Sequence, residues 1–464
     1  MDRLTVSGSA LVALLASIGC GSGASGIDRG AARGGLAGSA GQAAAGGAEA
    51  GDGGTAEGGA NGGFQGIYSS VDEGVFPKDR VLDVQVAMPA EEWTQLVATA
   101  RDEIWSSAEV SIDGQSLGDV GFRPKGEYSL WSCVDETGKL VCDKLSFKLK
   151  FDRNDPEKRF YGLKRLVLNK VTHGWGLFNE TLAYQIYNDF GIIAPRTSYA
   201  TLTVNGESLG IYRVVEAVDG RFTKMRFPDG DGNLYKEAWP VSTSDDYYAS
   251  ALETNEEDAS HDAFIAFSRA MIAANDDALP QTLSEYMDLE KLLDYMAVDY
   301  ALANWDGITT FYAGSWGQAN HNYYMYQAEG AARFTLIPWD LNAVLSIDHW
   351  LGDIGPWDEL DVECDTPIPT EDGDIGTMPA ACDATIRTVA LSRTGYHASV
   401  QRLLDEVFRL DRLSDAVDEY ARQVDPVMRD DPFMAHSEVS SGAEDVKSAL
   451  ASLRERLEAV LAEE

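Results

Sequence analysis

The sequence predicts an α+β protein with two lobes, a sheet-rich first lobe and a helical second lobe. Apolar residues alternate with period two in most segments up to residue 216, which is typical of strands. Beyond residue 259 the apolar spacing becomes helical. The part of the chain from 67 to 464 is too long for one hydrophobic core of ordinary size, which favours two lobes with a ligand cleft between them.

The first lobe is expected to be a sheet with a single amphipathic helix. Leu145, Phe147 and Leu149 point to the buried face of the clearest strand, so Lys148 and Lys150 share its other face. The helix spans 176–190 and carries Glu180 in its first turns. The expected strands and hairpins are 81–88, 108–124 with a turn at Asp113-Gly114, 145–151, 162–169, and 196–216 with a turn at Asn205-Gly206.

The second lobe is expected to be built from amphipathic helices. Their apolar residues recur three and four positions apart, as on the buried face of a helix. The expected helices are 263–274, 289–303, 398–423 and 443–463.

The N-terminal segment indicates export. Residues 1–19 contain one Arg and a short apolar run, which is typical of a signal peptide and too short to span a bilayer. Gly19-Cys20 predicts a lipoprotein acylated on Cys20; ordinary export with cleavage nearby is the alternative. In the predicted tether, residues 20–66, 30 of the 46 positions after Cys20 are Gly or Ala, so it has almost nothing to bury and is expected to be disordered.

Four cysteines remain after Cys20. Two of them enclose a short hydrophilic loop, and the other two flank an acidic loop rich in Pro and Gly. Since an even number in an exported chain indicates local bridges, we expect the disulfides Cys133–Cys142 and Cys364–Cys382.

The chain is strongly acidic. It has 75 Asp and Glu against 37 Lys and Arg, a formal net charge of −38. Such a surface repels nucleic acid and anionic membranes, so neither is an expected partner, and membrane attachment is expected only through Cys20. A nucleotide site would need local basic residues or a metal.

Three oxygen-bearing side chains of the second lobe form a candidate metal site. An apolar run, 334–339, ends at Asp340, while Asp306 follows Asn304-Trp305 and Asn322 begins an aromatic strand. Two carboxylates and an amide can hold Mg²⁺ together with a phosphorylated ligand. Asp340 as a cap and Asp306 as a cap or turn residue are the alternatives. A loop, 311–320, lies between Asp306 and Asn322.

An ordered set of motifs resembles the CotH kinase family, over roughly residues 80–350. The motifs are Arg123-Pro124-Lys125-Gly126-Glu127-Tyr128-Ser129, the strand 144–152, the helix 179–191, Val204-Asn205-Gly206, Gly210-Ile211-Tyr212, Val215-Glu216, Gly232-Asn233-Leu234-Tyr235-Lys236, Asn304-Trp305-Asp306, Asn322-Tyr323-Tyr324-Met325-Tyr326 and Ile337-Pro338-Trp339-Asp340. The resemblance implies an atypical protein-kinase-like fold, with an N-lobe of residues 67–216 and a helical C-lobe of residues 217–464.

The resemblance also implies roles for individual residues. A strand lysine would reach the phosphates of ATP and be held by Glu180 of the helix. Lys148 is the first candidate for this lysine, and Lys150 is the second. Arg123 and Lys125 would add charge near the phosphates. Three further roles follow: Glu216 would lie at the hinge beside the adenine, Asp306 would orient the acceptor hydroxyl as a base, and Asn322 with Asp340 would bind the metal.

Two functions are compatible with this resemblance. One is an exported protein kinase that uses ATP with Mg²⁺ or Mn²⁺ to phosphorylate Ser or Thr of secreted or surface proteins. The other is a surface or coat-assembly binding protein that keeps the kinase-like scaffold without turnover. Either would be a lipoprotein facing the periplasm or the cell surface.

Overall fold

A computed structural model describes residues 74–126, 128–314, 317–346, 357–369 and 376–462 of the chain. The predicted signal peptide, Cys20 and the tether lie outside these residues. Among the described helices, none combines the length and apolar character needed to cross a membrane.

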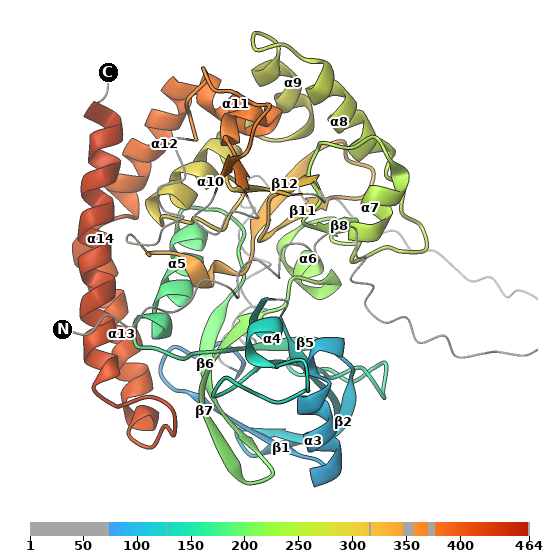
Figure 1. Cartoon of the computed structure of the whole chain (residues 1–464), viewed down its shortest axis with the longest axis vertical. Helices are drawn as coiled ribbons and strands as arrows, with labels where there is room; N and C mark the ends of the chain where they lie inside the picture. The colour runs from blue at the N-terminus through green and yellow to red at the C-terminus, as the bar shows by residue number, and fades with distance from the viewer. Residues whose placement is uncertain (1–73, 127, 315–316, 347–356, 370–375, 463–464) are drawn as a thin grey trace, which may run out of the picture.

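The first half of the structure is a closed seven-stranded barrel (Figure 1). Its strand order is β1-β2-β3-β4-β5-β7-β6, and parallel pairing of β1 with β6 closes it. The strands are β1 (Leu82–Ala87), β2 (Ser106–Ile112), β3 (Gln115–Lys125), β4 (Ser146–Lys150), β5 (Arg165–Lys170), β6 (Thr197–Val204) and β7 (Glu207–Glu216).

Alternating side chains and tight turns explain the barrel. Phe147 and Leu149 of β4 are fully buried inside it, whereas Lys148 between them lies on the outer face. Both predicted turns have positive φ at their two central residues, 50° and 74° at Asp113-Gly114 and 52° and 84° at Asn205-Gly206. Such turns match the twist of the strands they join.

Within the described residues, three α-helices interrupt the strands of this half. They are α3 (Ala90–Ala98), α4 (Tyr128–Cys133) and α5 (Asn179–Asp189). Both predicted disulfides are present: Cys133–Cys142 lies in the connection between β3 and β4, and Cys364–Cys382 lies in the second half.

The second half combines helices with two small sheets, so the expectation of a helical lobe with an aromatic strand at 322–326 was incomplete. The sheets have the orders β12-β11-β8 and β10-β9-β14-β13. The strands are β8 (Asn233–Lys236), β9 (Phe311–Gly314), β10 (Gly317–Ala319), β11 (Tyr323–Gln327), β12 (Phe334–Pro338), β13 (Ile368–Pro369) and β14 (Gly376–Met378). The segment 311–320, expected as a loop, therefore contributes β9 and β10.

Helices surround these sheets, and α14 runs along one side of the molecule toward the barrel (Figure 1). They are α6 (Gly220–Arg226), α7 (Asp245–Ala251), α8 (Asp262–Ala273), α9 (Leu279–Tyr286), α10 (Leu289–Ala301), α11 (Ala384–Leu391), α12 (Arg393–Glu406), α13 (Leu410–Met428) and α14 (Glu438–Ala462).

One predicted helix was wrong. Segment 398–423 is not a single helix, because α12 ends at Glu406 and α13 begins at Leu410. Phe408 lies in the break, is fully buried, and donates its backbone N–H to the carbonyl of Leu403 at 2.7 Å. Burial of this ring in the core explains why the chain turns here although its apolar spacing continues.

Two hydrophobic cores organise the molecule. One fills the barrel, and the other extends from α5 through the second half to α14. Val167 of β5 and Val215 of β7 belong to the second core although they lie on barrel strands. The outer face of β5 and β7 is therefore the surface on which the second half packs, and the polar side chains beside it lie where the halves meet.

Candidate functional site

Four basic side chains gather where the barrel meets the second half. Arg123 of β3 pairs in register with Lys148 of β4, and Lys125 lies two residues further along the same face. Lys236 ends β8 in the second half, and its charge acts on Lys148. We call Arg123, Lys125, Lys148 and Lys236 the cation cluster.

Lys148 is the group most affected by this crowding. Burial, followed by the charges of Arg123 and Lys125, lowers the pKa of Lys148 to about 7. Among the described residues it has no hydrogen-bond or ion-pair partner. Arg123 pairs with Glu103 at 2.8 Å and Lys236 lies 3.8 Å from Glu237, so within the described residues only Lys125 and Lys148 of the cluster have no acid partner. Two such lysines side by side favour an anionic ligand, and this chain is otherwise strongly acidic.

Lys125 is the most firmly positioned member of the cluster. It is buried, and its Nζ donates to Asn169 Oδ1 at 2.9 Å. Asn169 on β5 in turn donates Nδ2 to both carboxylate oxygens of Glu180 at 3.3 Å. The Lys125 Nζ also lies 5.8 Å from the centre of the Trp339 ring, next to Asp340. Lys125 thus connects the helix glutamate to the edge of the candidate metal site.

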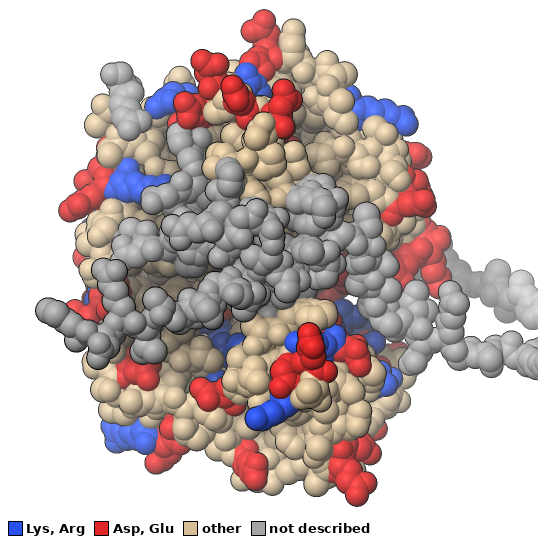
Figure 2. All heavy atoms as spheres, viewed as in Figure 1, with Lys and Arg blue, Asp and Glu red and all other residues tan. Residues whose placement is uncertain are grey.

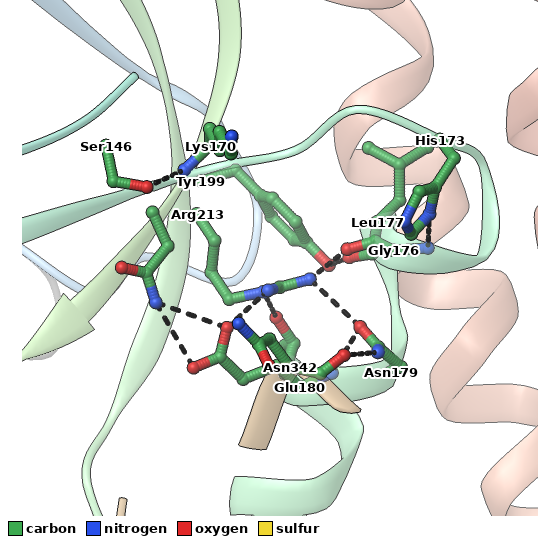
Figure 3. A network of polar contacts seen from close by, with 12 residues as sticks. Ser146, Lys170, His173, Gly176, Leu177, Asn179, Glu180, Tyr199, Arg213 and Asn342 are labelled. Carbon is green, nitrogen blue, oxygen red and sulfur yellow. Dashed lines mark hydrogen bonds and ion pairs between the residues drawn. The ribbon is translucent and has the colours of Figure 1, made fainter. Parts of the chain in front are cut away.

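Glu180 does not pair with Lys148 or Lys150, contrary to the expectation from the sequence. It is fully buried and forms an ion pair with Arg213 of β7, which also bonds Thr181 Oγ1 at 3.2 Å and Asn179 Oδ1 at 3.3 Å (Figure 3). The reason is the strand order: β5 lies between β4 and β7, so α5 meets β5 and β7 rather than β4.

The structure brings the three predicted oxygen ligands of the second half together. Asn322 donates Nδ2 to Asp306 Oδ2 at 2.7 Å and to the Asp306 carbonyl at 2.8 Å. The Asn322 carbonyl accepts the backbone N–H of Trp339 at 3.0 Å, which places Asp340 next to it. We call Asp306, Asn322 and Asp340 the acid–amide group.

Asp306 has an environment suited to proton transfer. Burial raises its pKa, and the charge of Asp340 adds to the rise. The Tyr312 hydroxyl, which donates to Asp306 Oδ1 at 2.6 Å, opposes it. The hydrogen bonds of Asp306 thus go to side chains rather than to the first turn of a helix, which argues against a simple cap.

Asp340 also does not behave as a cap. It precedes a 3₁₀ turn (Leu341–Ala343), but its side chain makes no capping hydrogen bond within the described residues. Its φ is 52°, and Asn322 and Glu237 nearby have φ of 65° and 55°. Backbone strain of this kind in non-glycine residues concentrates at functional sites.

Lys236 and Glu237 were missed as site residues by the sequence analysis. Lys236 Nζ lies 3.8 Å from Glu237 Oε1, the same oxygen that accepts the backbone N–H of Asn322 at 3.3 Å. Burial opposes ionisation of Glu237, yet the Lys236 charge helps to lower its pKa to about 2. Glu237 thereby joins the cation cluster to the acid–amide group. The position of Lys236 at the end of the motif 232–236 was the sequence feature that could have indicated these two residues.

Two other predicted site residues lie apart from this centre. Glu216 is fully buried and pairs with Arg196 (Nε to Oε2, 3.0 Å) and Arg226 (2.5 Å), so its side chain is occupied in an ion-pair network. Lys150 lies further along β4 than Lys148, and its main charged neighbours are Arg165, Asp152 and Arg153. Burial, followed by the charge of Arg165, lowers the pKa of Lys150, and the charge of Asp152 opposes this.

Charged side chains of both signs lie on the surface of the two halves. Figure 2 shows acidic and basic side chains interspersed on the upper and lower parts of one face, with some Lys and Arg also at the level where the barrel meets the second half. No group of three or more His, Cys, Asp or Glu in metal-binding geometry occurs in the described parts of the chain. Asp340 and Asn322 still fit a hard cation, because Mg²⁺ commonly takes one or two carboxylates and completes its shell with phosphate and water.

Comparison with known proteins identifies the family. The model of the family described as CotH kinase protein matches residues 122–452. The chain belongs to this family. The matched range contains the cation cluster and the acid–amide group, so both lie within the part that CotH kinase proteins share.

Relatives of the chain are distant. An inner spore coat protein H-like protein of Bacillus subtilis is 23% identical over 281 residues, 61% of this chain and 75% of that protein. Inner spore coat protein H of the same organism is 22% identical over 207 residues, 41% of this chain and 52% of that protein. A solved structure, the proinflammatory kinase CtkA of Helicobacter pylori, aligns with a TM-score of 0.29 and 13% identity, covering 63% of this chain and 90% of that one.

Proposed function

We propose that this CotH family protein is an exported kinase that transfers the γ-phosphoryl group of ATP to Ser or Thr of secreted or surface proteins. The observation that carries the proposal is the meeting of the cation cluster with the acid–amide group across the two halves. Phosphoryl transfer needs little besides positioning and neutralisation of charge, and these two groups supply both.

In this proposal the fold is kinase-like, and Lys125 takes the role first given to Lys148. In protein kinases a lysine on the strand before the helix pairs with the helix glutamate. Here that strand is β5, which presents Asn169 toward Glu180. Lys125 reaches Asn169 from β3, and Arg213 neutralises Glu180. The phosphate lysine is thus held through an amide and not by a direct ion pair.

The remaining residues divide the work between binding and transfer. Arg123, Lys148 and Lys236 neutralise the phosphate oxygens. Asp340 and Asn322 would hold Mg²⁺ or Mn²⁺, which when bound neutralises charge that develops on the phosphates. Asp306, with its raised pKa, would accept the proton of the acceptor hydroxyl. Adenine would lie toward the end of β7, where the backbone after Glu216 connects the halves.

Incubation of the full chain with γ-labelled ATP, Mg²⁺ or Mn²⁺ and an exported protein rich in Ser and Thr tests this function. We expect metal-dependent label on protein and its loss in Asp306→Asn. Absence of label with either metal would favour the second candidate, a surface or coat-assembly binding protein, which the coat-protein names of both relatives support.

The proposed setting is a lipid anchor at Cys20 followed by a flexible tether. Two disulfides and relatives named as coat proteins are compatible with a location outside the cytoplasm. The tether of residues 20–66 would span roughly 35–40 Å in root-mean-square distance if fully flexible.

A further inference from the structure

The disulfide Cys133–Cys142 lies in the segment that connects β3 and β4, the two barrel strands that carry Arg123, Lys125 and Lys148 of the cation cluster. Its sulfurs differ in accessibility: Cys133 ends α4 and is fully buried, whereas Cys142 is partly exposed. A nucleophile from solvent therefore reaches the Cys142 sulfur more readily. Attack at that sulfur makes Cys133 the leaving group.

A half-buried cation lies beside this leaving group. Lys170 Nζ donates to Cys133 Sγ at 2.8 Å. The backbone N–H of Lys170 is fixed by Ser146 Oγ at 3.0 Å (Figure 3). Burial lowers the pKa of Lys170, and the charge of Asp143 opposes this. A Cys133 thiolate would give the partly desolvated ammonium of Lys170 a close counter-charge, and a stabilised thiolate leaves faster in exchange.

The second disulfide of the chain lacks this feature. The sulfurs of Cys364 and Cys382 approach the carbonyl oxygens of Val362 at 3.8 Å and Glu363 at 4.0 Å. Neither is contacted by Lys or Arg within the described ranges. The chain therefore contains its own reference bridge.

We propose that Cys142 is a thiol-exchange site whose modification loosens the cation cluster. The thiolate of a small thiol attacks Cys142 Sγ and forms a mixed disulfide there. The Cys133–Cys142 bond breaks, and its electron pair remains on Cys133 as a thiolate facing Lys170. One thiolate is consumed and one is produced, so the step needs no separate oxidant or reductant.

Opening the bridge acts on residues of the proposed phosphate site. The bridged segment begins after Lys125 and ends before β4, which carries Lys148. Lys170 also follows Asn169, the partner of Lys125. The Cys133 thiolate would hold Lys170, the neighbour of Asn169, and the broken bridge would release the connection between β3 and β4. Both changes weaken the positioning of Lys125. This consequence, unlike the exchange itself, rests on the proposed function.

Exchange with glutathione tests the site. The full chain is incubated with reduced glutathione, quenched in acid, alkylated and mapped by peptide mass spectrometry. We expect glutathione on Cys142 and alkylation on Cys133. Lys170→Met should slow opening of this bridge by about tenfold and leave the Cys364–Cys382 rate unchanged. Lys139→Met, an exposed lysine of the same loop, is the matched control and should behave as wild type.

Glutathione found on Cys133, or equal opening rates in wild type and Lys170→Met, would overturn the exchange site. Nucleotide affinity before and after opening tests the consequence: a loss supports the coupling, and an unchanged affinity refutes it. A chain that binds no nucleotide even with both bridges intact refutes the proposed function instead, while the peptide map still decides the exchange site.

Discussion

Lys125 and Lys150 provide a matched comparison of two lysines on neighbouring strands. Lys125 contacts Asn169 and approaches Trp339, whereas the charged neighbours of Lys150 are Arg165, Asp152 and Arg153, away from the acid–amide group. Lys125→Met should weaken ATP binding by about 10- to 100-fold, because it removes one hydrogen bond from a charged group to the phosphates. Lys150→Met should change it little. Calorimetric titration with Mg·ATP measures the affinity of both variants. An equal loss of affinity in the two would mean that Lys125 has no specific role in binding the phosphates.

Lys148 should make nucleotide binding depend on pH. Its pKa is about 7 in the free protein, and phosphate oxygens favour the charged form, so binding raises this pKa. Between pH 7 and 9 binding then takes up a proton, and affinity falls as pH rises. Calorimetry at pH 8 in two buffers of different ionisation enthalpy detects that proton. Lys148→Met should abolish the difference between buffers; if it persists, another group takes up the proton.

Asp306 and Asp340 show how far single residues could be foreseen. Both were predicted as isolated acids, Asp340 at the end of an apolar run and Asp306 after Asn304-Trp305, and the structure brings them together with Asn322. Glu237 was missed because it follows a lysine in an unremarkable pair. Its importance arises from contact with Asn322, 85 residues away, which no local pattern reveals.

At the level of elements, the Glu180–Arg213 pair fixes α5 against β7. Both side chains are buried, so removing one charge leaves the other uncompensated. Glu180→Gln should lower the free energy of unfolding by about 3–5 kcal/mol. Asp189→Asn, an exposed acid at the other end of the same helix, should cost far less. Urea unfolding of wild type, Glu180→Gln and Asp189→Asn measures these differences. Similar free energies of unfolding for the three proteins would mean that the Glu180–Arg213 pair contributes little to stability.

The strands were predictable and their closure was not. Period-two spacing and two turns with Asn-Gly or Asp-Gly identify β1 to β7 within a few residues. The parallel pairing of β1 with β6 joins segments more than 100 residues apart, and no local sequence pattern indicates this pairing. For the same reason the partner of Glu180 was assigned wrongly: the strand order decides which cation meets the helix.

For the whole molecule, the anchor at Cys20 remains a prediction. Metabolic labelling with a clickable palmitate analogue in a bacterial host should mark the wild-type chain and spare Cys20→Ser. Cys142→Ser serves as a control that removes a cysteine elsewhere and should keep the label. Equal labelling of wild type and Cys20→Ser would reject the lipoprotein and leave ordinary export.

The central claim is that the two halves of the molecule form one metal-dependent nucleotide site. Equilibrium binding of ATP to wild type, Asp340→Asn and Asp306→Asn, each with and without Mg²⁺, tests it most directly. We predict Mg²⁺-dependent binding in wild type, its loss in Asp340→Asn because an amide lacks the charge a hard cation prefers, and its retention in Asp306→Asn, which should lose only turnover. Wild-type protein that binds no ATP with Mg²⁺ present would contradict the account and favour a binding protein on the same scaffold.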